Sequence, residues 1–377
     1  MRERICIIGD GLTGLTTALV LSSLNIKVNL VAPNFNKKFK DKRTTAISSS
    51  NYGFLLKFLN KKDSKFFWPS DQINLYHELP TGYKHFMNFQ NDNKNLLYTI
   101  ENSKLRQLLI KKIKENKKIK VFRKEIKKID TDNSAVLLKQ KLNYDIILLC
   151  LGKNSPIIKN LFGTRSVYKN LKEHAFTTTV KHSSNISTAS QYFLKEGPLA
   201  ILPLSKNKFS LIWSINSNFN LKNIENILKN KLKIILNTEN KFTFSKLSFF
   251  PISFKFNINS LKKNILVLGE GSYNVHPIAG QGYNLILRDV KTLCKEIQKN
   301  LSYGIQLKNS QVLNNFVRLR KPENFLFGFG INFINTFFKY NEITQPVKNL
   351  ILKDINKFKF LKDLSLNLSN KGIFYKS

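Results

Sequence analysis

The chain has 377 residues, 42% of them hydrophobic, and a formal net charge of +38 at pH 7. That length is enough for two domains or one large enzyme, and the composition is typical of a soluble globular protein. Cys6, Cys150 and Cys294 all lie in apolar runs, which excludes a disulfide framework and favours a reducing cytoplasm. Five histidines without HxxxH spacing, and no CxxC pair, predict no metal site.

The large positive charge admits three explanations. Lysines occur on every predicted element, and the chain is also rich in Asn, Ile and Phe, which favours the compositional drift of an AT-rich genome. Attraction to an acidic membrane surface is the second explanation. Nucleic acid is the third, but no arginine-plus-aromatic recognition motif occurs, so we expect no nucleic-acid partner.

The first predicted element is a buried strand from Arg4 to Ile8, and a helix is predicted from Leu15 to Leu24. Between them lies a GxGxxG turn, the fingerprint of dinucleotide binding when it joins a strand to a helix. The first glycine makes a tight turn, the second lets the backbone approach a pyrophosphate, and the third lets helix and strand pack closely. The turn consists of Gly9, Asp10, Gly11, Leu12, Thr13 and Gly14.

A second strand is predicted from Ile26 to Val31, where this fold usually ends in an acid that binds the adenosine ribose. Ala32 and Pro33 occupy that place. Either backbone or water therefore binds the ribose, or the acid comes from elsewhere in the chain.

The segment from Asp41 to Ser48 is predicted to open a helix that reaches about Leu59. Arg43 and Thr44 would then stand just before a helix start, where the arginine can reach a pyrophosphate or a flavin edge. The alternative is a surface arginine beside a helix cap.

Strands or a hairpin are predicted from Asp71 to Phe89, and a helix that begins at Glu101 and ends at Ile113. A continuous apolar strand, Tyr144 to Leu151, then ends at Gly152 and completes a Rossmann-type half. From His174 to about Phe256 the pattern changes to alternating strands, which predicts an antiparallel substrate sheet.

The chain returns to the first half through a strand at Ile265 to Leu268, so the two domains are interleaved. The predicted FAD-binding domain comprises residues 1–70, 96–170 and 262–310, the substrate domain 71–95 and 171–261, and a C-terminal helical region 311–377. The C-terminal region carries a Phe-rich face that is either core or an apolar surface for a membrane or a lipid tail. No run approaches the roughly 20 apolar residues of a membrane span, so we expect a cytoplasmic protein, peripheral at most to the inner face of the membrane.

A polar segment follows the returning strand and leads into an amphipathic helix. It contains an acid at the strand's end, a rigid His-Pro pair and a flexible Gly-Gln-Gly turn, which together make an anion cradle at a helix N-terminus. These residues are Gly269, Glu270, His276, Pro277, Gly280, Gln281, Gly282 and Asn284.

With the GxGxxG turn, the Arg-Thr-Thr-Ala-Ile-Ser block from Arg43 and this segment in one chain, the sequence resembles a known family. These are the FAD-dependent aromatic hydroxylases of ubiquinone biosynthesis, relatives of p-hydroxybenzoate hydroxylase. Glu196 to Leu204 is similar to the family's flavin-facing sheet, and Arg318 to Asn324 to its motif after the long helix. The resemblance implies an α/β fold, with a Rossmann-type FAD-binding domain interleaved with an antiparallel substrate sheet and followed by C-terminal helices.

The resemblance also implies roles. Glu270 would bind the ribityl chain of FAD, and the Gly280 turn with Asn284 would wrap the pyrimidine edge of the flavin. Pro277 would shape the substrate side of the ring, and His276 is the one histidine at the flavin, so these two are the flavin-side candidates. No side chain stands out as a proton-transfer base, and a structural role is the alternative for His276.

The implied reaction is hydroxylation of a polyprenylated phenol by O2, through a C4a-hydroperoxide on flavin reduced by NADPH or NADH. Contact with a membrane or with a quinone-biosynthesis complex would accompany it. Leu151 stands where the family has an aspartate, as Ala32 replaces the ribose acid. Another FAD-dependent oxidoreductase of prenyl substrates, or a weakened, non-catalytic member of such a complex, therefore remains an alternative.

Overall fold

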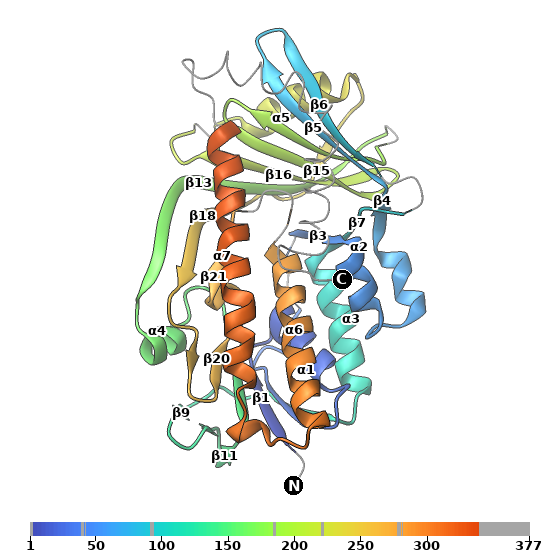
Figure 1. Cartoon of the computed structure of the whole chain (residues 1–377). Coiled ribbons are helices and arrows are strands. Elements are labelled where there is room, and N and C mark those ends of the chain that lie inside the picture. Colours follow the sequence, from blue (N-terminus) through green and yellow to red (C-terminus); the bar gives the residue numbers. More distant parts are fainter. Residues whose placement is uncertain are drawn as a thin grey trace.

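The protein is described by a computed structural model over residues 3–38, 41, 43–90, 94–183, 186–219, 222–276, 280 and 282–338 (Figure 1). Two large sheets form separate layers, and two long helices run beside them. The helices are α1 (Leu12–Leu21), α2 (Ser49–Leu56), α3 (Asn102–Glu115), α4 (Pro156–Phe162), α5 (Ile224–Leu236), α6 (Gly282–Ser302) and α7 (Val312–Phe338), with short 3-10 turns η1 (Lys61–Phe66), η2 (Gly269–Gly271) and η4 (Leu307–Asn309).

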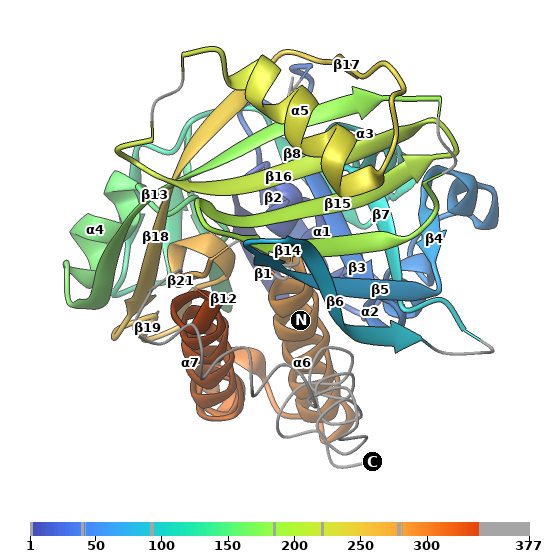
Figure 2. The same ribbon diagram turned by 90° about the horizontal axis from the view of Figure 1, so that it is seen from above.

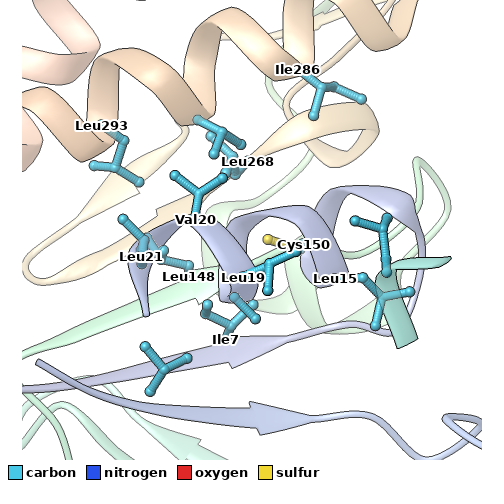
Figure 3. Packing of buried hydrophobic residues seen from close by; sticks show 14 of the residues in the cluster. Ile7, Leu15, Leu19, Val20, Leu21, Leu148, Cys150, Leu268, Ile286 and Leu293 are labelled. Carbon is cyan, nitrogen blue, oxygen red and sulfur yellow. The ribbon is translucent and has the colours of Figure 1, made fainter. Parts of the chain in front are cut away.

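The first layer is a six-stranded sheet in the order β19-β20-β12-β1-β2-β8. Its four pairs between β20 and β8 are parallel, and helices cover the sheet, which explains why its strands are apolar throughout. Figure 3 shows α1 packed between this sheet, at Ile7 and Leu148, and α6, at Ile286 and Leu293. The strands are β1 (Arg4–Ile8), β2 (Lys27–Val31), β8 (Ile119–Phe122), β12 (Ile146–Leu149), β19 (Leu261–Lys262) and β20 (Ile265–Val267). A small sheet covers the opposite face: β9 (Lys128–Asp130), β10 (Ala135–Leu137) and β11 (Lys141–Asn143).

The second layer is a larger sheet, ordered β21-β18-β13-β16-β15-β14-β5-β6, with β17 paired to β13. All its pairs are antiparallel except β14 with β5. Helix α5 crosses its outer face (Figure 2), where Phe176 and Trp213 are fully buried. The strands are β5 (Gln72–Leu79), β6 (Gly82–Gln90), β13 (Ser166–Lys181), β14 (Ala189–Leu194), β15 (Gly197–Ser205), β16 (Lys208–Asn216), β17 (Thr243–Phe244), β18 (Ser248–Asn257) and β21 (Tyr273–Asn274).

A third, three-stranded sheet lies between the two layers, in the order β3 (Thr44–Ser48), β7 (Leu97–Glu101), β4 (Trp68–Ser70). The helix predicted from Asp41 is wrong in its first part, because residues 44–48 form strand β3 and α2 begins at Ser49. All five side chains of β3 are buried, and three of them are β-branched, so pairing with β7 prevails over the helical pattern.

The predicted fold class is therefore confirmed: a Rossmann-type α/β layer is interleaved with an antiparallel sheet and followed by a C-terminal helix. Helix α7 runs along both layers and packs on α6 (Figure 1). Across the ranges that the structure describes, no helix is long and apolar enough to cross a membrane.

Candidate functional site

The glycine turn after β1 is shaped by close backbone packing. Gly9 has φ +133°, and a Cβ atom there would lie 2.2 Å from the carbonyl oxygen of Cys150. At Gly14 a Cβ atom would lie 2.0 Å from the carbonyl oxygen of Gly9, whereas at Gly11 it would meet nothing within 4 Å. Two glycines are thus required by packing, and the middle one faces open space.

Helix α1 begins at this open space with Leu12 and Thr13. No side chain caps its N-terminus, and its first turn contains no acid. The first N–H groups of a helix have no partner within the helix and attract anions. The turn therefore fits a pyrophosphate.

The segment after β20 lies directly against this turn. Gly269 has φ +79°, and a Cβ atom there would lie 2.8 Å from Cγ2 of Thr13. Glu270 follows in η2, is exposed, and forms no hydrogen bond or ion pair with the described residues. Gly152 also faces open space, with nothing within 4 Å of an added Cβ atom. Motifs about 255 residues apart in sequence are thus in contact.

Arg43 stands just before β3 and forms a bidentate ion pair with Asp41. Its Nη2 lies 2.8 Å from Oδ2, and its Nε lies 3.0 Å from Oδ1. Burial by itself would lower the pKa of Arg43, but the hydrogen bonds and charge of Asp41, with the charge of Glu270, raise it above its ordinary value. Arg43 and Glu270 therefore lie within electrostatic reach of one another.

The side chain of Asn284 connects the N-terminal end of α6 to β3 through hydrogen bonds. Its side chain donates to the carbonyl of Ala46 at 2.8 Å, and accepts from the N–H of Ser48 at 2.9 Å and from Nδ2 of Asn51 at 3.0 Å. The side-chain amide of Asn284 is thus engaged with β3 and α2, and the flavin contact expected of this residue stays a prediction. Gly280 has φ +62° and packs against Ala46.

The remaining residues predicted for the site lie in this turn and in β3. Gly282 is the first residue of α6, and an added Cβ atom there would meet nothing within 4 Å. Thr44, in β3, has a buried hydroxyl without a hydrogen-bond partner in the described chain. Pro277 and Gln281 lie outside the described residues.

His276 is fully buried and joins three elements. Its Nε2 lies 2.8 Å from Oε2 of Glu173 on β13. Asn335 of α7 donates to the same carboxylate at 3.3 Å. The sequence pointed to the histidine, but neither Glu173 nor Asn335 stood out from its local pattern.

Two further residues were missed by sequence reasoning. The carboxylate of Asp10 accepts a hydrogen bond of 2.7 Å from the N–H of Asn34, which lies two residues past Ala32. An acid therefore does lie beside the end of β2. Arg106, buried on α3, donates to the carbonyls of Asn34 at 2.9 Å, Lys37 at 3.1 Å and Asp10 at 3.3 Å. An acid inside the glycine motif, and an arginine in a lysine-rich helix, were the available signals.

The inner face of the second layer carries polar atoms without partners. Thr177, Ile212, Ala200 and Gln191 stand opposite one another on successive strands, and Ala200 and Ile212 pack toward β3 and β7. The hydroxyl of Thr177 and the amide oxygen of Gln191, roughly 14 Å apart across three strand spacings, are both buried without a hydrogen-bond partner in the described chain. Since buried polar groups normally have partners, these two oxygens are candidates for ligand binding.

Comparison with known proteins gives relatives of one kind. No protein-family model matches the chain. The mitochondrial ubiquinone biosynthesis monooxygenase COQ6 of Dictyostelium discoideum is 24% identical, over 97% of this chain and 90% of that protein. The 3-demethoxyubiquinol 3-hydroxylase of Escherichia coli is 28% identical over a shorter stretch, 40% of each chain. These relatives confirm the predicted resemblance to the hydroxylases of ubiquinone biosynthesis.

Solved structures show the same fold at low sequence identity. The p-nitrophenol 4-monooxygenase PnpA of Pseudomonas putida superposes with a TM-score of 0.83, at 14% identity and over 99% of both chains. HpxO of Klebsiella pneumoniae, solved with FAD and uric acid, gives a TM-score of 0.74 at 10% identity, over 99% of this chain and 98% of that one.

Proposed function

We propose that this protein is an FAD-dependent monooxygenase of ubiquinone biosynthesis, which hydroxylates the aromatic ring of a polyprenylated phenol with O2 and NADPH or NADH. The observation that carries the proposal is the contact between Thr13 and Gly269, because it joins a pyrophosphate turn to an exposed acid in one site. The relatives named above support the substrate class, since their names refer to ubiquinone.

The chain offers residues for each part of FAD. The N–H groups of Leu12, Thr13 and Gly14 would bind the pyrophosphate at the start of α1, with Gly11 giving access. Asp10 would bind the adenosine ribose in place of the missing acid at Ala32, and Glu270 the ribityl chain. Arg43, Thr44, Gly152, Gly269 and the backbone of Gly280, Gln281, Gly282 and Asn284 would complete the site. Bound FAD supplies electron transfer from the nicotinamide donor to O2.

The phenol would lie on the inner face of the second layer. There Thr177 would bind an oxygen substituent of the ring, while Ala200 and Ile212 exclude water from the reacting carbon. Gln191, three strand spacings from Thr177, is too far away to bind the same ring. A polar group held on a rigid sheet orients a ring more narrowly than an apolar surface does. His276, bonded to Glu173, would position the segment that leads to Pro277, and we propose no proton transfer through it.

The domain boundaries given above are part of this proposal. A break in the pairing of β13 with β18 falls between Asn170 and Glu173, which supports a boundary at 170. The C-terminal region 311–377 would place the protein peripherally on the inner face of the membrane. On α7 four apolar side chains are 42–63% exposed: Leu326, Phe329, Phe333 and Ile334. The sequence between Asn324 and Phe338 contains no charged residue.

A vesicle assay tests that surface. The protein should co-sediment with phosphatidylglycerol vesicles, and Phe329→Ser/Phe333→Ser should weaken this binding without changing the unfolding temperature. Unchanged binding by the double variant would remove α7 from the membrane contact.

Labelled oxygen tests the reaction itself. Protein loaded with FAD and supplied with NADPH and a prenylated phenol should incorporate one atom from labelled O2 into the ring, as read by mass spectrometry. A converted but unlabelled product would instead indicate a dehydrogenase or reductase. Failure to bind FAD at all would favour the second candidate, a non-catalytic member of a quinone-making complex. Leu151 and Ala32, which replace two acids of the family, are the reason for this candidate.

A further inference from the structure

Helix α7 has two different faces along its second half. The apolar side chains proposed above for a membrane are exposed on its outer face. Gly328, Ile331 and Asn335 are buried on its inner face, and they recur at spacings of three and four residues, as expected for one side of a helix. One stretch of helix therefore contacts the protein interior on one side and carries the proposed membrane surface on the other.

The inner face packs beside β21 (Figure 1). A Cβ atom at Gly328 would lie 3.0 Å from Cγ1 of Val275 and 3.1 Å from Cε2 of Phe254 on β18. Both separations are shorter than ordinary van der Waals contacts, so a side chain at this position would push α7 away from the segment. Val275 immediately precedes His276. Glycine thus brings the backbone of α7 against the residue next to His276.

About two turns further along α7, Asn335 reaches the same segment through a buried carboxylate. Its Nδ2 donates to Glu173 on β13, at 3.3 Å from Oε1 and 3.4 Å from Oε2. The same Oε2 lies 2.8 Å from Nε2 of His276. These three side chains are at most 6% exposed, and hydrogen bonds to a carboxylate are strong in such surroundings. A shift of α7 at Asn335 therefore displaces the carboxylate that binds His276.

His276 in turn leads to the turn that is proposed to bind FAD. It stands four residues before Gly280 in the sequence, and Gly280 packs against Ala46 of β3. Gly282 then begins α6. The segment that follows β21 is thus held by α7 near its start and carries the proposed flavin contacts at its end.

The contacts at the end of α7 oppose one another. The ring of Phe338 stacks on Phe193 of β14, with centroids 3.7 Å apart, which stabilises the packed position of the helix. The side-chain oxygens of Asn332 and Asn335 are buried without a hydrogen-bond partner in the part of the chain that the structure describes, which destabilises this position. The net preference for the packed position is therefore smaller than the aromatic contact alone would give, and a ligand that favours it adds to it.

A membrane on the outer face is a ligand of this kind. In the packed position the amide of Asn335 is turned inward to Glu173, away from the exposed apolar side chains. A helix that rotated or lifted would bring the amides of Asn332 and Asn335 to the membrane, where polar groups without partners are costly. The membrane therefore favours the position in which Asn335 binds Glu173.

We propose that Asn335 and Glu173 are positioning residues that couple α7 to the Gly280 turn, so that an anionic membrane on α7 and FAD in its site strengthen each other's binding. This inference rests on the proposed function, from which both ligands come. FAD favours the arrangement in which the turn is fixed, and the membrane favours the packed helix that fixes it. Each ligand then raises the affinity for the other by the same factor, and no bond is made or broken.

Vesicle binding with and without FAD tests the coupling. Co-sedimentation with phosphatidylglycerol vesicles should show that saturation with FAD raises the vesicle affinity of the wild type at least about fivefold. Flavin fluorescence should show that vesicles raise the FAD affinity by the same factor. Neither measurement depends on turnover.

Two variants carry the same substitution at different places on α7. Asn335→Leu removes the donor to Glu173 with little change in side-chain volume, and it should reduce the coupling factor to less than about twofold. Its vesicle binding without FAD should match the wild type, because the outer face is intact. Asn314→Leu, at an exposed position near the start of the helix, is the control and should keep the wild-type factor.

A conservative variant separates positioning from folding. In Glu173→Gln the carboxamide can accept from His276 and donate to Oδ1 of Asn335 once that side chain has turned over, so most of the coupling should remain. The coupling factor compares each protein with itself, with and without the second ligand. A loss of stability alone therefore leaves the factor unchanged.

Three outcomes would overturn the coupling. The first is a wild type in which vesicles and FAD bind independently or in which either fails to bind. The second is a wild-type factor in Asn335→Leu, and the third is an equal loss in Asn314→Leu. The proposed function is tested apart from this: wild type that binds FAD but puts no labelled oxygen into the phenol would overturn hydroxylation and leave the coupling standing.

Discussion

Two sets of buried polar residues in this protein differ in whether their hydrogen-bonding atoms have partners. Between α6 and α7, Asp289 accepts hydrogen bonds from Tyr273 at 2.6 Å, from Arg320 at 2.7 Å and from Asn324 at 2.9 Å. Burial, together with the charge of Asp289, raises the pKa of Tyr273 well above its ordinary value, so it remains a donor. On the inner face of the second layer, Thr177 and Gln191 each have a buried oxygen without a partner in the described chain.

We infer that the difference separates residues that stabilise the fold from residues that bind a ligand. A satisfied buried network stabilises the native state and loses stability when one partner is removed. An unsatisfied buried group costs stability until something binds it. Residues of the first kind should therefore affect unfolding, and residues of the second kind should affect ligand binding.

The largest effect is expected from the satisfied carboxylate. Asp289→Ala removes the acceptor of three buried donors and leaves Arg320 with Glu323 as its carboxylate partner, so it should lower the free energy of unfolding by about 3–5 kcal/mol. Urea denaturation measures this, with Glu296→Ala on the same helix as a control that should stay within about 0.5 kcal/mol of the wild type. A loss below about 1 kcal/mol for Asp289→Ala would contradict the structural role of this network.

Glu270 is an exposed acid that forms no hydrogen bond or ion pair with the described residues, so we group it with the proposed ligand-binding residues. Glu270→Ala should weaken FAD binding roughly tenfold to a hundredfold, the equivalent of one lost charge-assisted hydrogen bond. Flavin fluorescence quenching measures the affinity, and Glu270→Asp should retain most of it. If Glu270→Ala bound FAD as tightly as the wild type, the site described here would be wrong.

Thr177 and Thr178 test the comparison at neighbouring positions. Thr178 faces the other side of the sheet, and its hydroxyl donates to the carbonyl of Ser245 at 3.0 Å. Thr178→Val should cost about 1 kcal/mol of stability and leave the KM for the phenol unchanged. Thr177→Val should cost no stability and raise that KM a few-fold, up to about tenfold. Equal behaviour of the two variants in thermal unfolding and steady-state kinetics would abolish the distinction.

The smallest effect is expected from Asp41, a satisfied acid near the surface. Burial opposes its ionisation, but the hydrogen bonds and charge of Arg43 lower its pKa below the ordinary value. Its contribution is therefore present above about pH 4 and is lost as the pH falls through the lowered pKa. Because Arg43 is half exposed, the amount should stay within about 1 kcal/mol. Asp41→Asn should flatten the unfolding curve between about pH 5 and pH 2, and an unchanged curve would contradict the assignment.

Much of the fold followed from local pattern. The glycine turn and the helix that contains Arg106 were predicted close to their observed bounds. The antiparallel sheet was predicted to begin at His174, whereas β13 begins at Ser166. Strand β3 was predicted as helix, because its small and β-branched residues directly precede α2 and the local pattern does not separate the two elements. Its pairing with β7, whose sequence lies about 50 residues away, decided its conformation.

The sequence by itself determined the kind of site, because a pyrophosphate turn needs glycines at fixed spacing and a parallel sheet needs apolar strands. The tertiary structure decided which side chains are available to it. Asn284 and Asp10 illustrate this. Asn284 was predicted to wrap the pyrimidine edge of the flavin with the Gly280 turn, and its side-chain amide hydrogen-bonds to β3. Asp10 was predicted only as part of the glycine turn, and its carboxylate lies beside the end of β2. A side chain's role depends on which of its hydrogen bonds the protein has already filled, and those partners come from segments that are distant in sequence.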